Sequence, residues 1–276
     1  MTDTDLSAHL IDRLRPHRGL PDGLVEHRQG RFGQIVVAKE GNELFLVFCP
    51  SGVPLSNQAL SGVMSRIDLT NPLTLTGVYT QAMLACLAFV PDPRQVYMMG
   101  GGGGRVPTVL HALLPDVTIS GSEIDRDVLD LSCQYFGLED TARISISCAE
   151  GKRDLSFYNN DFFDHLYLDC FAANGRVPPE LTTKSFFDMC RSKLKPGGVI
   201  SMNFVDSDPK FAGQKKRFAR VFDDVRSFQF KGTHVMFGRK AAQTDSDDLI
   251  EIARSLQDKL PFGFDLVNHV RQLHPI

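Results

Sequence analysis

The stretch Gln95–Pro107, QVYMMGGGGGRVP, decides the fold. A short apolar run, Val96–Met99, leads into five glycines, Gly100–Gly104, and a helical pattern, Val106–Leu114, follows directly. Five adjacent glycines in a packed element would cost backbone entropy with no side chains to recover it. Between a buried strand and its crossover helix, they are typical of a loop whose backbone approaches a ligand closely.

Alternating strand and helix patterns continue after the glycines. The expected strands are Val117–Ser120, Ile144–Cys148, His165–Leu168 and Val199–Phe204, followed by an antiparallel pair, Phe228–Phe230 and His234–Phe237. The expected helices between and after them are Arg126–Phe136, Thr183–Leu194, Lys210–Phe222 and Asp247–Leu260. Repeated β-α units favour a mainly parallel sheet covered on both faces. We therefore expect an α/β fold built on a mainly parallel sheet.

The first part of the chain has a different pattern. After a short helix and an irregular lead-in, two strand-type runs, Gln34–Ala38 and Leu44–Phe48, flank Glu40-Gly41-Asn42, which indicates a β-hairpin. One more strand is expected before residue 72, and a helix over Thr76–Phe89. The expected division is a small β-rich N-terminal domain, 1–72, and an α/β domain, 73–276.

Composition narrows the class of protein. The 276 residues are 42% apolar and 23% charged with a net charge of −3, which gives no basic footprint for nucleic acid or an anionic membrane. The longest unbroken apolar run, Ala82–Val90, is far shorter than the roughly 20 residues of a membrane span, and the start MTDTD is unlike a signal peptide. The histidines lack metal-binding spacing and the cysteines form no C-x-x-C pair. We expect a soluble, cytoplasmic protein without metal.

The residues after the glycines separate three kinds of ligand. A Walker loop ends in G-K-[ST], but Arg105, Val106 and Pro107 stand here, which disfavours an NTPase. A dinucleotide fingerprint needs a third glycine where this sequence has Arg105 or Val106. The remaining pattern, G-x-G-x-G at 100, 102 and 104, suits a nucleoside without a pyrophosphate.

Acidic residues stand at the ends of the next predicted strands. Glu123 follows the second strand as a candidate acceptor for ribose hydroxyls, and Asp125 is expected to cap the next helix. Glu150 and Gly151 follow the third strand, where an acidic side chain and turn backbone could bind an adenine amino group. Asp169 ends the fourth strand, and beside a cationic sulfonium it could orient an amine and accept its proton. Together these features predict an S-adenosyl ligand.

Several segments resemble the spermidine synthases and related polyamine aminopropyltransferases. They are VYTQAM (78–83), PDPRQVYMMGGGGG (91–104), SEID (122–125), YFGL (135–138), Glu150-Gly151 and YLDCFAANGRVPPELTTKSFF (167–187). The resemblance implies a homodimer and the same two-part plan. In this plan residues 73–276 form a Rossmann-like nucleoside-binding catalytic domain with a seven-stranded sheet of the S-adenosylmethionine-methyltransferase type. The resemblance further implies transfer of an aminopropyl-type group from S-adenosylmethionine, or its decarboxylated form, to a small-molecule amine acceptor, with release of methylthioadenosine.

The resemblance also implies residue roles. The donor's methionine-derived chain and ribose would bind to Glu123, Ile124 and the glycine loop, Gly100, Gly101, Gly102, Gly103 and Gly104. The adenine side would bind to Glu150 and Gly151, and Tyr79 with Asp169 would activate the amine.

Two departures from the family pattern leave alternatives open. The usual loop G-G-G-D-G has Gly103 at its acidic position here, and the loop after the fourth strand keeps Asp169 but has Ala172 in place of its second acid. Loss of these acids makes room for a donor carboxylate or a less cationic acceptor, and it disfavours putrescine.

An S-adenosylmethionine-dependent methyltransferase acting on a small molecule is one alternative function, because the fold hosts both chemistries. A non-catalytic adenosyl-ligand-binding module is the other.

Overall fold

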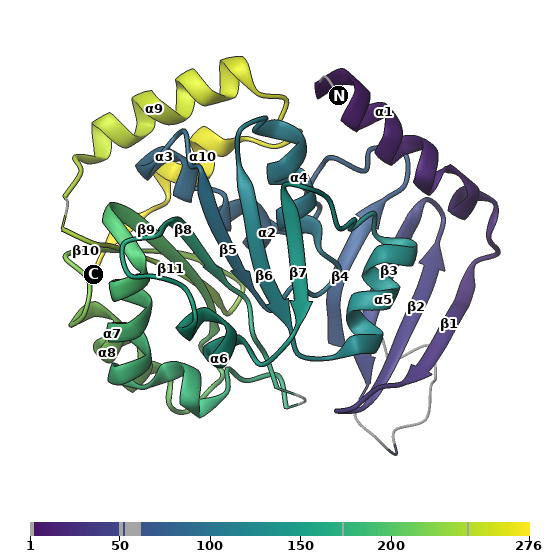
Figure 1. The fold of residues 1–276 in the computed structure, drawn as a ribbon, viewed down its shortest axis with the longest axis horizontal. Helices are drawn as coiled ribbons and strands as arrows, with labels where there is room; N and C mark the ends of the chain where they lie inside the picture. The colour runs from purple at the N-terminus through teal and green to yellow at the C-terminus, as the bar shows by residue number, and fades with distance from the viewer. Residues whose placement is uncertain (1–2, 50–51, 53–61, 173, 242) are drawn as a thin grey trace.

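Two β-sheets lie side by side in the computed structural model, which describes residues 3–49, 52, 62–172, 174–241 and 243–276 (Figure 1). The smaller sheet is antiparallel, in the order β1-β2-β3-β4. Its strands are β1 (Gly23–Gln29), β2 (Gln34–Glu40), β3 (Glu43–Cys49) and β4 (Val63–Asp68). Residues 53–61 of the predicted N-terminal domain lie outside the described residues, and the division at residue 72 stays a prediction.

The larger sheet has eight strands in the order β12-β10-β11-β9-β8-β5-β6-β7. They are β5 (Gln95–Met99), β6 (Thr118–Glu123), β7 (Ile144–Cys148), β8 (Phe163–Leu168), β9 (Leu194–Val205), β10 (Asp224–Phe230), β11 (Thr233–Arg239) and β12 (His274–Pro275). Neighbours from β9 to β7 pair in parallel, whereas β10, β11 and β12 add antiparallel pairs at the other edge. The predicted fold class is confirmed, with the two-residue β12 added to the seven expected strands.

Helices cover both faces of the larger sheet (Figure 1). One face packs against α2 (Val78–Met83), α3 (Cys86–Phe89), α4 (Arg105–Leu113), α9 (Ser246–Lys259) and α10 (Leu266–Arg271). The other face packs against α6 (Gly151–Ser156), α7 (Lys184–Lys193) and α8 (Phe211–Ala219). Successive residues of each central strand pack into the cores on opposite faces of the sheet. Both faces of β5 are therefore buried, which explains why its sequence is a continuous apolar run.

A third apolar cluster joins the two sheets. It combines Leu10 and Leu14 of α1 (Asp3–Leu14), residues of β2 and β3, and the face of α5 (Arg126–Tyr135) that carries Val128 and Leu131. The same helix packs Leu129 into the core of the larger sheet. Because α5 contacts both cores, it fixes the smaller sheet against the larger one.

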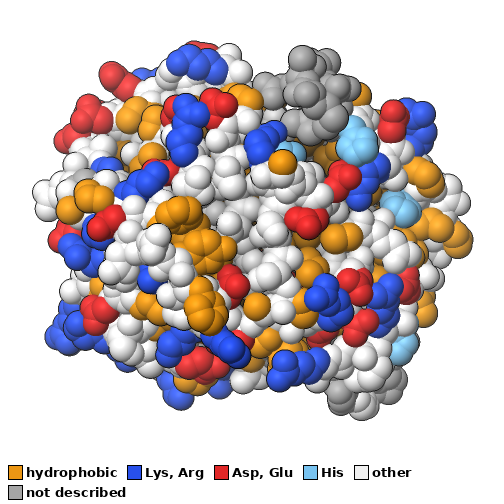
Figure 2. Space-filling view, viewed as in Figure 1, with side chains coloured by type: hydrophobic (Ala, Val, Ile, Leu, Met, Phe, Trp, Pro, Cys, Tyr) orange, Lys and Arg blue, Asp and Glu red, His pale blue; other side chains and the backbone are white. Residues whose placement is uncertain are grey.

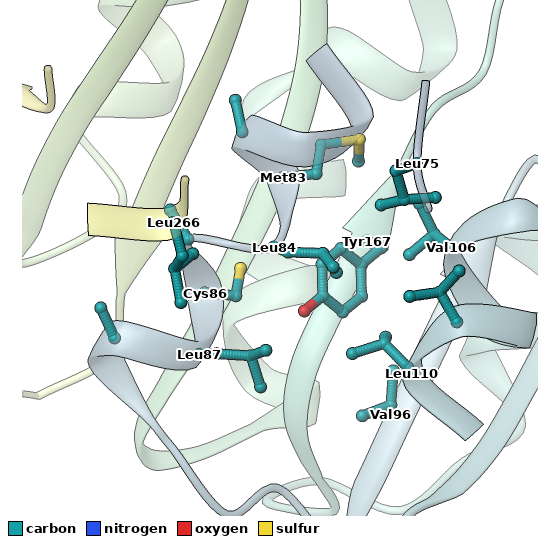
Figure 3. Close-up of a cluster of buried hydrophobic side chains, with 14 of the residues drawn as sticks. Leu75, Met83, Leu84, Cys86, Leu87, Val96, Val106, Leu110, Tyr167 and Leu266 are labelled. Atoms are coloured by element: carbon teal, nitrogen blue, oxygen red, sulfur yellow. The ribbon is translucent and has the colours of Figure 1, made fainter. Parts of the chain in front are cut away.

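Figure 3 shows the core beneath the cavity, where Tyr167 of β8 lies among Met83, Leu84, Leu87 and Leu110. The Tyr167 ring is fully buried, and its hydroxyl contacts His165 Nδ1 at 3.1 Å. Burial lowers the pKa of His165 to about 4, so the imidazole is neutral at pH 7. This packing holds the end of β8 in place, two residues before Asp169.

Two local predictions differ from the structure, and two short helices were not predicted. The expected helix over Thr76–Phe89 is two short helices, α2 and α3, separated by Leu84 and Ala85. Residues 23–29 belong to the expected irregular lead-in, because their sequence, GLVEHRQ, lacks strict alternation. Antiparallel pairing with β2 makes them a strand, β1. Helices α6 and α10 have six residues each, too short to show a helical period.

Candidate functional site

A cavity of about 950 Å³ lies between the two sheets, at the carboxyl ends of the parallel strands. Its walls come from the glycine loop, from residues that follow β6, β7 and β8, and from Val63, Met64 and Ser65 of β4. This is the edge at which open α/β sheets bind ligands. Lys, Arg, Asp and Glu side chains are intermixed over the molecular face seen in Figure 2, with no extended region of one charge sign.

The glycine loop packs directly on the residue that ends β8. A Cβ atom at Gly100 would lie 2.5 Å from the Asp169 carbonyl oxygen, and the Asp169 amide donates to the Met99 carbonyl at 3.0 Å. Gly100 and Gly104 have positive φ values of 80° and 66°, and Gly104 is the residue before α4. Side chains at these positions would therefore be strained, and one at Gly100 would separate the loop from Asp169.

The acidic residue after β6 points at the same loop. Glu123 is buried, and its carboxylate accepts the amides of Gly102 and Asp125 at 3.1 Å each. Burial raises the pKa of Glu123, while these amide hydrogen bonds oppose the shift. Ile124 is partly exposed and lines the cavity beside it. The predicted cap is confirmed, because the Asp125 carboxylate accepts the Asp127 amide at 3.0 Å.

The residues after β7 form the start of a helix. The carboxylate of Glu150 accepts the amides of Lys152 and Arg153 at 2.9 Å each, so it caps α6. Glu150 and Gly151 both line the cavity. Each carboxylate oxygen has a second lone pair, so the capping role leaves acceptor capacity on the cavity side.

Asp169 lies in the cavity with two polar neighbours. Asn203, near the end of β9, donates from Nδ2 to Asp169 Oδ1 at 2.9 Å. The Tyr79 hydroxyl donates to the Met64 carbonyl at 3.2 Å, and the phenol also interacts with the Asp169 carboxylate. Burial raises the pKa of Asp169 to about 6, against the opposing hydrogen bonds of Asn203 and Tyr79. Burial and then the Asp169 charge raise the pKa of Tyr79 well above its usual value.

The structure therefore brings the predicted site residues to one cavity, except Gly104, which does not line it and packs against Leu138. It adds Asn203, which was not predicted from the sequence. Asn203 is buried, and its Oδ1 has no hydrogen-bond partner among the described residues. Its signal was present in the sequence. It lies at the carboxyl end of the fifth predicted strand, the same position that singled out Asp169 in the fourth.

A side chain at position 103 would overlap the smaller sheet. A Cβ atom there would lie 2.5 Å from Ser65 Oγ, 2.6 Å from Ser65 Cβ and 3.3 Å from Phe136. Ser65 belongs to the smaller sheet, which no pattern near the glycines could place. Loss of the acid at position 103 thus coincides with close approach of β4, and whether it makes room for a different ligand group stays a prediction.

The described residues contain no group of three or more His, Cys, Asp or Glu side chains placed to hold a metal ion. No helix within the described ranges is long and apolar enough to cross a membrane.

Comparison with known families agrees with this geometry. Residues 78–225 match the model of the spermine/spermidine synthase domain, which spans more than half of the chain. The chain belongs to this family. The matched range begins at α2, with Tyr79, and includes the glycine loop, Glu123, Asp169 and Asn203.

Individual relatives fall into two groups. A polyamine aminopropyltransferase of Chromobacterium violaceum is 26% identical over 218 residues, covering 76% of this chain and 82% of the relative. An eEF1A lysine and N-terminal methyltransferase of Bos taurus is 26% identical over 203 residues, covering 65% of this chain but 29% of the relative. A spermidine synthase crystallised with the transition-state analogue AdoDATO shares the fold, with a TM-score of 0.69, 20% identity, and coverage of 91% of this chain and 84% of that chain. Both curated relatives are transferases by name.

The filled space beside Gly103 gives a first prediction. Gly103→Ala should destabilise the protein by about 1–3 kcal/mol, because the new methyl group overlaps Ser65. Gly101→Ala is the matched control, since the nearest atom to its Cβ would be 3.7 Å away. Ser65→Gly removes the overlapping side chain. In that background, Gly103→Ala should lower the free energy of unfolding much less than it does in the wild type. Urea unfolding measures all four variants; equal stability of Gly103→Ala and Gly101→Ala would contradict the packing argument.

Proposed function

We propose that the protein transfers an aminopropyl-type group from an S-adenosyl sulfonium donor to an amine. The observation that carries the proposal is Asp169, a carboxylate with a pKa of about 6 in a cavity beside a glycine-rich loop. A base with a pKa near the working pH is suited to take the proton of an amine as it reacts. Membership of the spermine/spermidine synthase family supports the same chemistry.

The donor's nucleoside is assigned to the edge formed by β5, β6 and β7. Glu123 lies where it can accept hydrogen bonds from the ribose hydroxyls, in exchange for its present bonds to backbone amides. The adenine would lie between Ile124 and the Glu150–Gly151 turn, which line the next part of the cavity. The loop Gly100–Gly104 then faces the sulfonium and its methionine-derived chain. A structural neighbour was crystallised with the transition-state analogue AdoDATO, which supports an S-adenosyl-type ligand for this fold.

The chemical step is a direct displacement. The amine nitrogen attacks the propyl carbon bound to the sulfonium, the carbon–sulfur bond breaks, and sulfur keeps the electron pair as neutral methylthioadenosine. The amine must be unprotonated to attack, and the proton it sheds goes to Asp169. Asn203 and Tyr79 hold that carboxylate in place, and the unpartnered Oδ1 of Asn203 can accept an N–H of the acceptor. Positioning and proton removal suffice for such a step.

Methyl transfer is the second candidate. Gly103 and Ala172 lack the two acids that the family pattern uses, and Ser65 fills the space beside the first of them. Similarity to an eEF1A methyltransferase favours this candidate too. The same amine, base and sulfonium would be used, but the nitrogen would attack the methyl carbon and the product would be S-adenosylhomocysteine.

The acceptor end of the cavity suits a bulky amine of low charge. Phe32, Val63 and Phe171 are among the large apolar side chains with exposed surface, and they line this cavity. On this side the cavity has two acids, Asp169 and the exposed Glu180, among the described residues. A diamine needs a carboxylate for its second ammonium group, because an unpaired charge in a desolvated cleft is costly. Asp169 cannot be both base and counter-ion, and the charge of the exposed Glu180 is screened by solvent.

A binding experiment tests the nucleoside site. Glu123→Ala should weaken methylthioadenosine binding by about 1.5–3 kcal/mol, the range for hydrogen bonds to a charged group. Glu180→Ala, an acidic residue at the exposed rim of the same cavity, is the matched control and should leave the affinity unchanged. Titration calorimetry measures both. Unchanged affinity in a folded Glu123→Ala protein would remove Glu123 from the ribose site.

Asp169 gives a kinetic prediction. Asp169→Asn should keep methylthioadenosine bound but lower the turnover rate roughly 10²–10⁴-fold. In the wild type the working base is the ionised carboxylate, so the rate at saturating acceptor should fall as the pH drops through about 6. The Asn variant should lose that break in its pH–rate profile. An Asn variant as active as the wild type would return Asp169 to a structural role.

Product analysis tests the reaction itself. The protein is incubated with S-adenosylmethionine or decarboxylated S-adenosylmethionine and a panel of amines, and nucleoside products are identified by mass spectrometry. We expect methylthioadenosine or, for the second candidate, S-adenosylhomocysteine, with a bulky monoamine preferred over putrescine. A kcat/KM for putrescine above roughly 10⁴ M⁻¹s⁻¹ would refute our account of the acceptor site.

A further inference from the structure

Arg105 is a buried cation beside the glycine loop. It is the first residue of α4, its exposed fraction is 4%, and it lines the cavity. Its Nη1 donates to the Phe136 carbonyl at 2.8 Å and its Nη2 to the Pro72 carbonyl. Its Nε has no hydrogen-bond partner in the described part of the chain. Burial lowers the pKa of Arg105 to about 10, with no carboxylate countering it.

The two carbonyl partners do not neutralise the guanidinium, although the Phe136 carbonyl lies at the carboxyl end of α5, where a cation is favoured. Carbonyl oxygens carry only a partial negative charge, so a buried guanidinium without an anion still carries a desolvation cost. A guanidinium offers five N–H groups, and a planar carboxylate is the anion that matches its fork geometry. An anion bound to Arg105 would offset this desolvation cost, and the described residues place no carboxylate there.

A smaller hollow of about 260 Å³ adjoins the cavity at this point. It shares Ser65, Tyr79 and Arg105 with the cavity and adds Arg66 and Thr76. Two arginines and several hydroxyl groups line it, and no Asp or Glu stands among its described lining residues. Arg66 is half-exposed and has Glu43 at 3.8 Å, which leaves Arg105 as the uncompensated charge.

This distribution of charge is the opposite of what an amine-ended donor arm needs. Decarboxylated S-adenosylmethionine ends in an ammonium group, which an acid at position 103 would hold. Here position 103 is glycine, the adjacent space holds the Ser65 hydroxyl, and the charge two residues later is positive. The methionine arm of intact S-adenosylmethionine ends in an α-amino acid, whose carboxylate the hydroxyl and the guanidinium can bind together.

We propose that the donor keeps its carboxylate, and that Arg105 and Ser65 bind this group in the hollow beside Tyr79. The inference rests on the proposed function, because it assigns the donor of the same reaction. With this donor, the amine forms its new N–C bond to either the methyl group or the 3-amino-3-carboxypropyl group, the corresponding C–S bond breaks, and sulfur keeps the electron pair. The amine's proton leaves to Asp169 in both cases.

Calorimetry with three probes tests the assignment: S-adenosylmethionine, decarboxylated S-adenosylmethionine and methylthioadenosine, without any acceptor. The wild type should bind S-adenosylmethionine at least tenfold more tightly than the decarboxylated form. Arg105→Gln, which can still donate to a backbone carbonyl, should weaken S-adenosylmethionine binding at least tenfold and change methylthioadenosine binding less than twofold. Arg105→Lys keeps the charge and should retain part of the preference. Lys39→Gln, which removes a buried cation of the smaller sheet, is the matched control and should leave all three affinities unchanged.

Different failures separate the two proposals. A wild-type preference below twofold, or a preference for the decarboxylated form, overturns the carboxylate site even if Arg105→Gln does not fold. An equal loss of affinity for S-adenosylmethionine and methylthioadenosine in Arg105→Gln also overturns it, because the defect would then lie in the nucleoside site. If methylthioadenosine binds and S-adenosylmethionine does not, the donor inference fails while the nucleoside site stands. Failure of all three probes to bind the wild type overturns the proposed function as well.

Discussion

The close approach of the glycine loop to the end of β8 is the constraint on which the site depends. Gly100 can contact the Asp169 carbonyl because it has no Cβ, and the Asp169 amide is in turn bonded to Met99. β5 and β8 are neighbours in the sheet, so the loop that would hold the donor and the candidate base leave the sheet at the same place. The distance between donor and base is thereby set by backbone packing, which side-chain motion does not change.

The second requirement is closure by the smaller sheet. Strand β4 places Ser65 against Gly103 and the Met64 carbonyl against the Tyr79 hydroxyl, so one wall of the cavity comes from outside the parallel sheet. Helix α5 packs into both cores, and Arg105 bonds to carbonyls on either side of the junction. These contacts bury Arg105 beside the place where a charged arm would lie, and burial strengthens the charge interactions that this side chain makes.

Charge at this junction distinguishes the chain from the usual pattern of its family. Position 103, which is acidic in the family pattern, is glycine here, and Arg105 supplies a cation nearby, while the candidate base Asp169 is present. The residue proposed as the base is thus kept, while the charge has changed sign in the part of the cavity proposed to recognise the end of the donor arm. Such a change alters which substrate binds without requiring a new base, because recognition and proton transfer use different residues.

The sequence by itself determined the fold class, because strand and helix periods are local and the glycine run marks the first crossover. It also located Glu123, Glu150 and Asp169, since the carboxyl ends of parallel strands share one edge. It could not determine that residues 23–29 form a strand, which depends on pairing with β2. Only the tertiary structure decided that Ser65 fills the space at Gly103 and that Arg105 is buried without an acid, because both depend on how a distant strand packs across the loop.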